Sequence, residues 1–290
     1  MTGAVLVLVL VACSKSPYPA EPSAGPALPS VDRAPFSHVK ASVDEANASV
    51  LLPLDAYVYS PEEWEVVSSA NAYLVEDCVR SQGRPLIEGH SDLQVSEYRR
   101  YGPWVIKLAE VNGWEPVKLK RAEGIYDSGV RYGADGVPDD ALSAFRECAA
   151  QLEASGDYIP ELTPGWAATE NTVVGQLTSQ ASEMTYRDPE YREINRQWLE
   201  CIKSEGLTPD PGNGEWGVET GASSREQQIR DAVKDVRCKQ KFAAIQRLSD
   251  IEAQYQAALM ASKEAQLAEL AKTKRDALSK AGKVLAEHGA

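Results

Sequence analysis

Histidine is scarce in this sequence, and the motifs of common catalytic and metal sites are missing. The 290 residues include three histidines, His38, His90 and His288, and none of them lies near a cysteine in sequence. No Gly-x-Ser-x-Gly, Gly-x-x-x-x-Gly-Lys-Ser or His-Glu-x-x-His motif occurs. We therefore expect no histidine-based catalytic triad, no metal site and no cofactor.

Positive charge and long apolar runs are also in short supply. The chain carries 30 lysines and arginines against 43 aspartates and glutamates, a net charge of -13. Such a chain repels phosphate backbones, so nucleic acid is not an expected partner. No run approaches the about 20 consecutive apolar residues that a membrane-spanning helix needs. With 43% hydrophobic and 25% charged residues, the composition is that of a globular protein with one large or two modest domains.

The first thirteen residues carry a targeting signature. The apolar stretch Ala4–Ala12 ends in Leu-Val-Ala-Cys, which resembles a bacterial lipobox. In that pathway Ala12 would precede the cleaved bond, and the thiol of Cys13 would carry a diacylglycerol anchor. No lysine or arginine precedes the apolar run, which is shorter than a usual signal of about 15 to 30 residues. We expect residues 1–13 to be a lipoprotein signal and lipobox; the alternative is a buried N-terminal strand.

Residues 14–42 have the composition of a tether. Six prolines stand among serine, alanine and glycine, and such a segment cannot bury enough apolar surface to offset its chain entropy. Proline-rich linkers extend by about 3.1 Å per residue. We expect a disordered tether that holds a folded body above the bilayer.

Four cysteines remain besides Cys13, an even number that predicts two disulfides in a compartment outside the cytosol. They are Cys78, Cys148, Cys201 and Cys238. Zinc binding is the alternative, but no Cys-x-x-Cys pair exists. Cys201 precedes a predicted helix end and Cys238 lies inside the next helix. The loop of residues 206–222 is long enough to join these helices in an offset antiparallel pair. We therefore pair Cys201 with Cys238 and Cys78 with Cys148, while the other two connectivities stay open.

Helix start and stop signals predict a mainly α protein. Proline and acidic residues at the first turn, with glycine after the end, indicate helices near residues 61–82, 138–155 and 189–205. From Ser223 the chain has no glycine or proline until Gly282, with one candidate break at Ser249-x-x-Glu252. The expected fold is a disulfide-bridged helical bundle with a long C-terminal helix. We assign residues 43–160 to a helical region with a loop insertion, and residues 161–290 to a helical hairpin and the long helix. That helix could pack on the bundle, form a coiled-coil arm or lie on anionic lipid.

The loop insertion, residues 84–137, is rich in glycine and aromatic residues and includes one short helix at about residues 103–112. Tyr101, Trp104 and Trp114 are candidate ligand-binding residues, because aromatic side chains with polar groups on loops bind glycans or peptides. This hypothesis predicts that both tryptophan rings are exposed on one surface. The alternative is that the aromatic residues form a small core under the loops.

A carboxylate-based hydrolase is the remaining enzyme hypothesis. Acidic residues abound, and a hydrolase of this kind needs two of them facing each other across a cleft, about 5 to 9.5 Å apart. Sequence spacing does not reveal such a pair. We therefore name no catalytic residue.

Several short motifs resemble those of a family of uncharacterised predicted lipoproteins and secreted proteins from actinobacteria. They are Leu52-Pro53-Leu54-Asp55, Cys78 to Gly83, Arg100-Tyr101-Gly102, Gly113-Trp114, Asp188-Pro189-Glu190, Trp198-x-x-Cys201 and Asp235 to Lys239. The resemblance implies an extracytoplasmic location and a helical, disulfide-bridged fold, and it carries no catalytic residue. We expect a lipid-anchored, non-catalytic binding or structural protein whose partner is a cell-envelope protein or glycan. The alternatives are an envelope hydrolase and a glycan-binding module.

Overall fold

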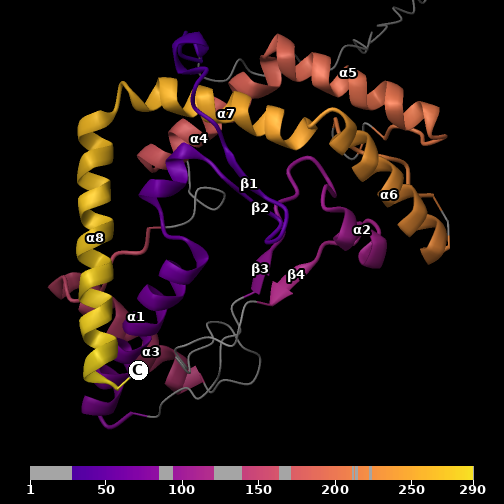
Figure 1. Cartoon of the computed structure of the whole chain (residues 1–290). Coiled ribbons are helices and arrows are strands. Elements are labelled where there is room, and N and C mark those ends of the chain that lie inside the picture. The colour runs from indigo at the N-terminus through magenta and orange to yellow at the C-terminus, as the bar shows by residue number, and fades with distance from the viewer. Residues whose placement is uncertain are drawn as a thin grey trace, which may run out of the picture.

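The computed structural model describes residues 28–84, 94–120, 139–162, 171–210, 212, 215–221 and 224–289. Within these ranges the chain is mainly helical (Figure 1), which confirms the predicted fold class. The helices are α1 (Pro61–Ser81), α2 (Ile106–Asn112), α3 (Asp139–Ser155), α4 (Val173–Arg187), α5 (Pro189–Ser204), α6 (Arg225–Lys241), α7 (Ala244–Met260) and α8 (Glu264–Glu287). The short elements are strands β1 (Ser42–Asp44), β2 (Ser49–Leu51), β3 (Gln94–Ser96) and β4 (Lys118–Lys120), and 3-10 helices η1 (Ala34–Phe36) and η2 (Pro53–Tyr57). The predicted signal and Cys13 lie outside the described residues.

The helix starts follow the capping signals in the sequence. The Ser60 side chain accepts a hydrogen bond from the Glu63 backbone N–H at 3.2 Å, and the Glu63 carboxylate accepts one from the Ser60 N–H at 2.8 Å. This reciprocal capping box fixes the start of α1. Asp188 caps α5 by accepting from the Glu190 N–H at 2.8 Å. The predicted starts of these two helices are confirmed.

The C-terminal stretch forms three helices. The chain breaks at Ala243, which has a φ of 48°, and again between α7 and α8. The break predicted at Ser249 is wrong, because both Ser249 and Glu252 lie inside α7 with buried side chains. The Glu252 carboxylate binds Arg100 and does not cap a helix start. The last helix, α8, has 24 residues and is the long C-terminal helix that the sequence predicts.

The helices pack in pairs. α8 lies along α1, which also contacts α3, while α4 lies on α7 and α2 lies on α6 (Figure 1). α8 therefore packs on its own chain through a buried face: Leu267, Ala277, Ala281, Val284 and Leu285. The largest hydrophobic cluster lies among α5, α6, α7 and the segment before α2. A smaller hydrophobic cluster lies between α1 and α3 and is formed by residues of both helices.

The loop insertion between α1 and α3 contains regular structure. It includes α2 and an antiparallel pair of β3 and β4, in which Val95 lies opposite Leu119. Gly113, with a φ of 62°, ends α2 close to where the sequence predicts. A second antiparallel pair, β1 and β2, precedes α1 and places Val43 opposite Val50.

The predicted tether needs a correction at its C-terminal end. Residues 28–42 belong to the described structure, and Arg33 Nε lies 2.7 Å from Asp188 Oδ2. The buried Ala41 donates its N–H to Asp250 Oδ1 at 3.0 Å. This part of the segment is ordered because its polar groups find partners on α5 and α7, which its own composition does not show. Residues 14–27 lie outside the described residues.

Candidate functional site

Two disulfides connect the helices as the sequence argument proposes. Cys78 of α1 is bonded to Cys148 of α3, and Cys201 of α5 to Cys238 of α6, with Cα–Cα distances of 5.8 and 5.7 Å. The predicted connectivity is confirmed. Two disulfides in one chain indicate an oxidising, extracytoplasmic environment. No helix in the described ranges is long and apolar enough to cross a bilayer.

The Cys201–Cys238 disulfide is part of the main hydrophobic cluster. Cys201 is 8% exposed and Cys238 is 1% exposed. Trp198 lies one turn before Cys201, is fully buried, and belongs to the same cluster. An aromatic residue three positions before a cysteine shares its helix face, so Trp198 and Cys201 both face the main cluster.

A buried ion pair lies next to this disulfide. Asp235 accepts a hydrogen bond from Trp198 Nε1 at 2.7 Å and one from Lys239 Nζ at 2.7 Å, and both charged side chains are fully buried. Lys239 Nζ also donates to the Pro103 carbonyl at 3.0 Å. Burial raises the pKa of Asp235 and lowers that of Lys239, while the contact between them opposes both shifts. A Cβ on Gly102, which has a φ of 73°, would lie 3.1 Å from Lys239 Nζ, so glycine lets the loop approach the lysine.

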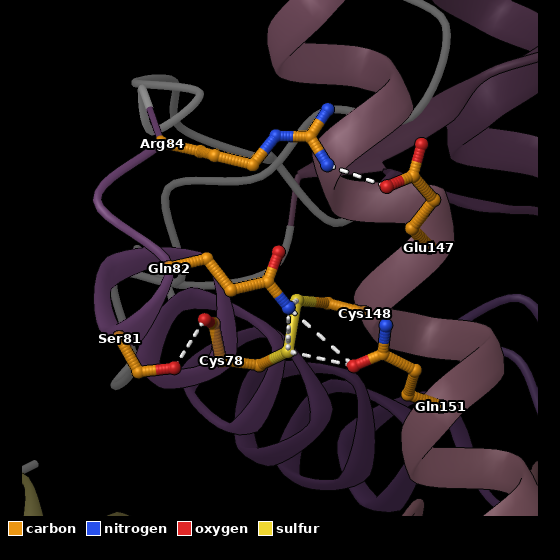
Figure 2. The surroundings of a disulfide bond; sticks show 7 residues. All are labelled: Cys78, Ser81, Gln82, Arg84, Glu147, Cys148 and Gln151. Carbon is orange, nitrogen blue, oxygen red and sulfur yellow. Dashed lines mark hydrogen bonds and ion pairs between the residues drawn. A yellow bond between two sulfur atoms is a disulfide. The ribbon is translucent and has the colours of Figure 1, made fainter.

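The Cys78–Cys148 disulfide joins the last two turns of α1 to α3 (Figure 2). Cys148 is fully buried, whereas Cys78 is half-buried. The Gln82 side-chain amide nitrogen lies 3.5 Å from Cys78 Sγ and 3.4 Å from Cys148 Sγ. The same nitrogen lies 3.4 Å from Gln151 Oε1, which orients the amide across the disulfide. The exposed side of this disulfide is therefore that of Cys78, and a polar donor lies against both sulfur atoms.

The aromatic candidates belong to the interior. Tyr101 is fully buried and Trp104 is 3% exposed, with its indole N–H donated to the Tyr98 carbonyl at 2.6 Å. Trp114 is half-buried and packs against both the main cluster and the small cluster between α2 and α6. The two tryptophan rings do not form an exposed pair, so the glycan-binding hypothesis built on them is wrong. The alternative, a core under the loops, describes these residues.

A second buried ion pair was not foreseen from the sequence. Arg100 Nη1 lies 2.6 and 2.5 Å from the two oxygens of Glu252, whose side chain is fully buried. Arg100 also donates to Ser182 Oγ. Its guanidinium carbon lies 5.8 Å from the ring centroid of Tyr101 and 5.4 Å from that of Tyr186. The pair joins the loop before α2 to α4 and α7. The residues are 152 positions apart, so no local signal could have revealed them.

Buried carboxylates are paired with cations throughout the described ranges. Each acidic side chain of a residue that is at most 9% exposed has an ion-pair partner: Glu97 with Arg99, Asp188 with Arg33, Asp235 with Lys239, Asp250 with Lys40, and Glu252 with Arg100. Burial also raises the pKa of Asp55, whose carboxylate accepts from the Leu52 N–H at 2.7 Å as the cap of η2. These acids serve packing and capping, and the described residues include no group of three histidines, cysteines or acids that could hold a metal ion.

The chain matches no protein-family model, no curated protein and no solved structure.

Proposed function

We propose that this protein is a lipid-anchored, non-catalytic binding or structural component of the bacterial cell envelope. The observation that carries the proposal is the pair of disulfides, which bridge sequence separations of 70 and 37 residues. Each should stabilise the fold by about 4 kcal/mol through restriction of the unfolded chain. A helical scaffold that depends on such bonds suits an oxidising compartment and is poorly suited to the reducing cytosol.

An anchor at Cys13 would limit how far the described part of the chain lies from the bilayer. The first described residue is Leu28, and Arg33 binds the N-terminal end of α5 through Asp188 and Glu190. The chain from Cys13 to Leu28, 15 peptide units, spans at most roughly 50 Å when fully extended. An acylated Cys13 would therefore hold the edge formed by η1, α5 and α7 within that distance of the bilayer. The resemblance to predicted actinobacterial lipoproteins agrees with this arrangement.

The interior supports a scaffold role over catalysis. The most deeply buried carboxylates bind cations, and the rings of Tyr101 and Trp104 fill the core. A carboxylate-based hydrolase would need an open pair of acids flanked by rings. The buried acids and rings therefore stabilise the fold, which supports a binding role for the surface of the protein.

The proposal is tested in cells that produce the full chain. Metabolic labelling with an alkyne fatty acid should label the protein, and cell fractionation should find it in the membrane fraction. Cys13→Ala should abolish the label and the membrane location. Cross-linking in intact cells would then identify the envelope protein or glycan that it contacts. An unlabelled wild-type chain in the cytosolic fraction would reject the proposal.

A further inference from the structure

The two disulfides differ in how far an attacking thiol could reach them. Cys201, Cys238 and Cys148 are 8%, 1% and 0% exposed, and only Cys78 among the four bonded cysteines is more than slightly exposed. Thiol–disulfide exchange requires a thiolate to reach a sulfur atom along the S–S axis, so access decides which disulfide reacts and at which sulfur. The exposure of the four residues therefore favours attack at Cys78. Figure 2 shows Cys78 near the end of α1, bonded to Cys148 on α3.

The Gln82 amide gives this disulfide a second feature, a polar donor at its sulfur atoms. Its Nε2 lies 3.5 Å from Cys78 Sγ and 3.4 Å from Cys148 Sγ, the sulfur that would leave as a thiolate after attack on Cys78. An N–H donor next to a leaving sulfur stabilises the negative charge that develops there, and a better leaving thiolate speeds the exchange. Cys201 and Cys238 lie instead within the main hydrophobic cluster.

We propose that Cys78–Cys148 is a site of thiol–disulfide exchange with dithiols, and that Cys78 Sγ is the atom attacked. The first thiolate of the dithiol forms a bond to Cys78 Sγ as the Cys78–Cys148 bond breaks, and the electron pair leaves on Cys148 Sγ beside the Gln82 amide. The second thiol, after losing its proton, attacks the mixed disulfide and releases Cys78. The dithiol is oxidised to a disulfide, and Cys78 and Cys148 take up two electrons and two protons.

Exchange at this site would break the covalent link between α1 and α3 and leave the Cys201–Cys238 bond in the main cluster intact. The Cys78–Cys148 bond joins α1 to α3, whose shared apolar cluster is small. Arg84 Nη1 and Glu147 Oε2, 2.5 Å apart, remain as a surface ion pair between the residues after α1 and α3. The Cys201–Cys238 disulfide holds α5 to α6 independently. This inference goes beyond the proposed envelope role and does not depend on an anchor at Cys13.

The test uses the oxidised full chain and dithiothreitol as the dithiol, under conditions where circular dichroism shows that the fold is kept. Free thiols are alkylated at successive times and located by peptide mass spectrometry. We expect Cys78 and Cys148 to become labelled at least about tenfold faster than Cys201 and Cys238. With glutathione as a monothiol, the first mixed disulfide should form on Cys78.

A matched pair of variants tests the role of the amide. Gln82→Leu should slow the opening of Cys78–Cys148 by several-fold and leave the rate at Cys201–Cys238 unchanged. Ser81→Ala removes a neighbouring hydroxyl that binds the Cys78 carbonyl and not its sulfur, so it should leave both rates unchanged. Equal opening rates for the two disulfides in the wild-type chain, or a first glutathione adduct on Cys148, would overturn the assignment.

Discussion

The imidazole of His288 stacks on the ring of Tyr73, with centroids 4.5 Å apart and planes inclined by 21°. His288 lies at the C-terminal end of α8 and Tyr73 on α1, so the contact fastens the end of the long helix. His288 Nε2 also lies 3.0 Å from Oδ2 of Asp77, the residue before Cys78.

This contact predicts a pH dependence of stability. The pKa of His288 is raised, chiefly by its hydrogen bond to the Val284 carbonyl and also by Asp77. A raised pKa in the folded state means that the stabilisation is complete below the unfolded value of about 6.5 and is lost as the pH rises through the folded value. Urea unfolding of wild type and His288→Phe should therefore differ more at pH 5.5 than at pH 8.5, by up to about 1 kcal/mol for a surface pair. The same difference at both pH values would contradict this account.

Removing one partner of the Arg100–Glu252 pair should be strongly destabilising. Glu252→Gln leaves the Arg100 guanidinium without a counter-charge in a largely buried position, which costs about 3 to 5 kcal/mol. The double variant Arg100→Met with Glu252→Met removes both charges and should recover part of that loss. Unfolding by urea without reductant measures each free energy. A double variant that is no more stable than Glu252→Gln would contradict the pairing of the two charges.

The indole N–H of Trp198 should matter beyond its volume. Trp198→Phe keeps a ring beside the disulfide but removes the hydrogen bond to the buried Asp235 carboxylate. We expect a loss of about 1 to 3 kcal/mol in the free energy of unfolding. Trp114→Phe is the control, because this ring is only half-buried and packs against the small cluster between α2 and α6. Its loss in the free energy of unfolding should be smaller. Equal losses in the two variants would remove the special role of the Asp235 contact.

The packed part of the proline-rich segment is tested at Arg33. Burial raises the pKa of Asp188, but hydrogen bonds from Arg33 and Tyr255 outweigh it and hold that pKa below its usual range. A lowered pKa contributes stability above the unfolded value of about 3.9, and this is lost as the pH falls through the folded value. Arg33→Ala should cost about 1 to 3 kcal/mol at pH 7, because the buried carboxylate loses its cation. Asp32→Asn, at the preceding residue, keeps an acceptor for the Ala34 N–H and should be nearly neutral. A neutral Arg33→Ala would mean that the segment is only a tether.

Local signals and cysteine spacing predicted much of the fold. The capping box at Ser60 and the Asp188-Pro189 start mark helix ends through interactions within a few residues, and they are confirmed. The connectivity of the cysteines followed from the lengths of helices and loops. Helix α4 was missed, although Thr172 caps it by accepting from the Gly175 N–H at 3.0 Å, because no proline or acidic residue marks its first turn.

The parts that were missed depend on contacts between distant residues. Arg33 binds Asp188 across 155 positions, and Arg100 binds Glu252 across 152. Neither distance is visible in a sequence pattern. No glycine or proline marks the turn at Ala243 in the sequence. The turn lies between α6 and α7, which run in different directions (Figure 1). Tyr101 and Trp104 looked like surface binders because their segment is a loop, yet the main cluster encloses both rings.

The most direct measurement is peptide mapping of the protein isolated from its own cells after its free thiols have been blocked. We predict a chain that begins at an acylated Cys13 and has linked peptides joining Cys78 to Cys148 and Cys201 to Cys238. A chain that retains residues 1–12, lacks acyl groups and shows all four of these cysteines blocked as free thiols would contradict the account.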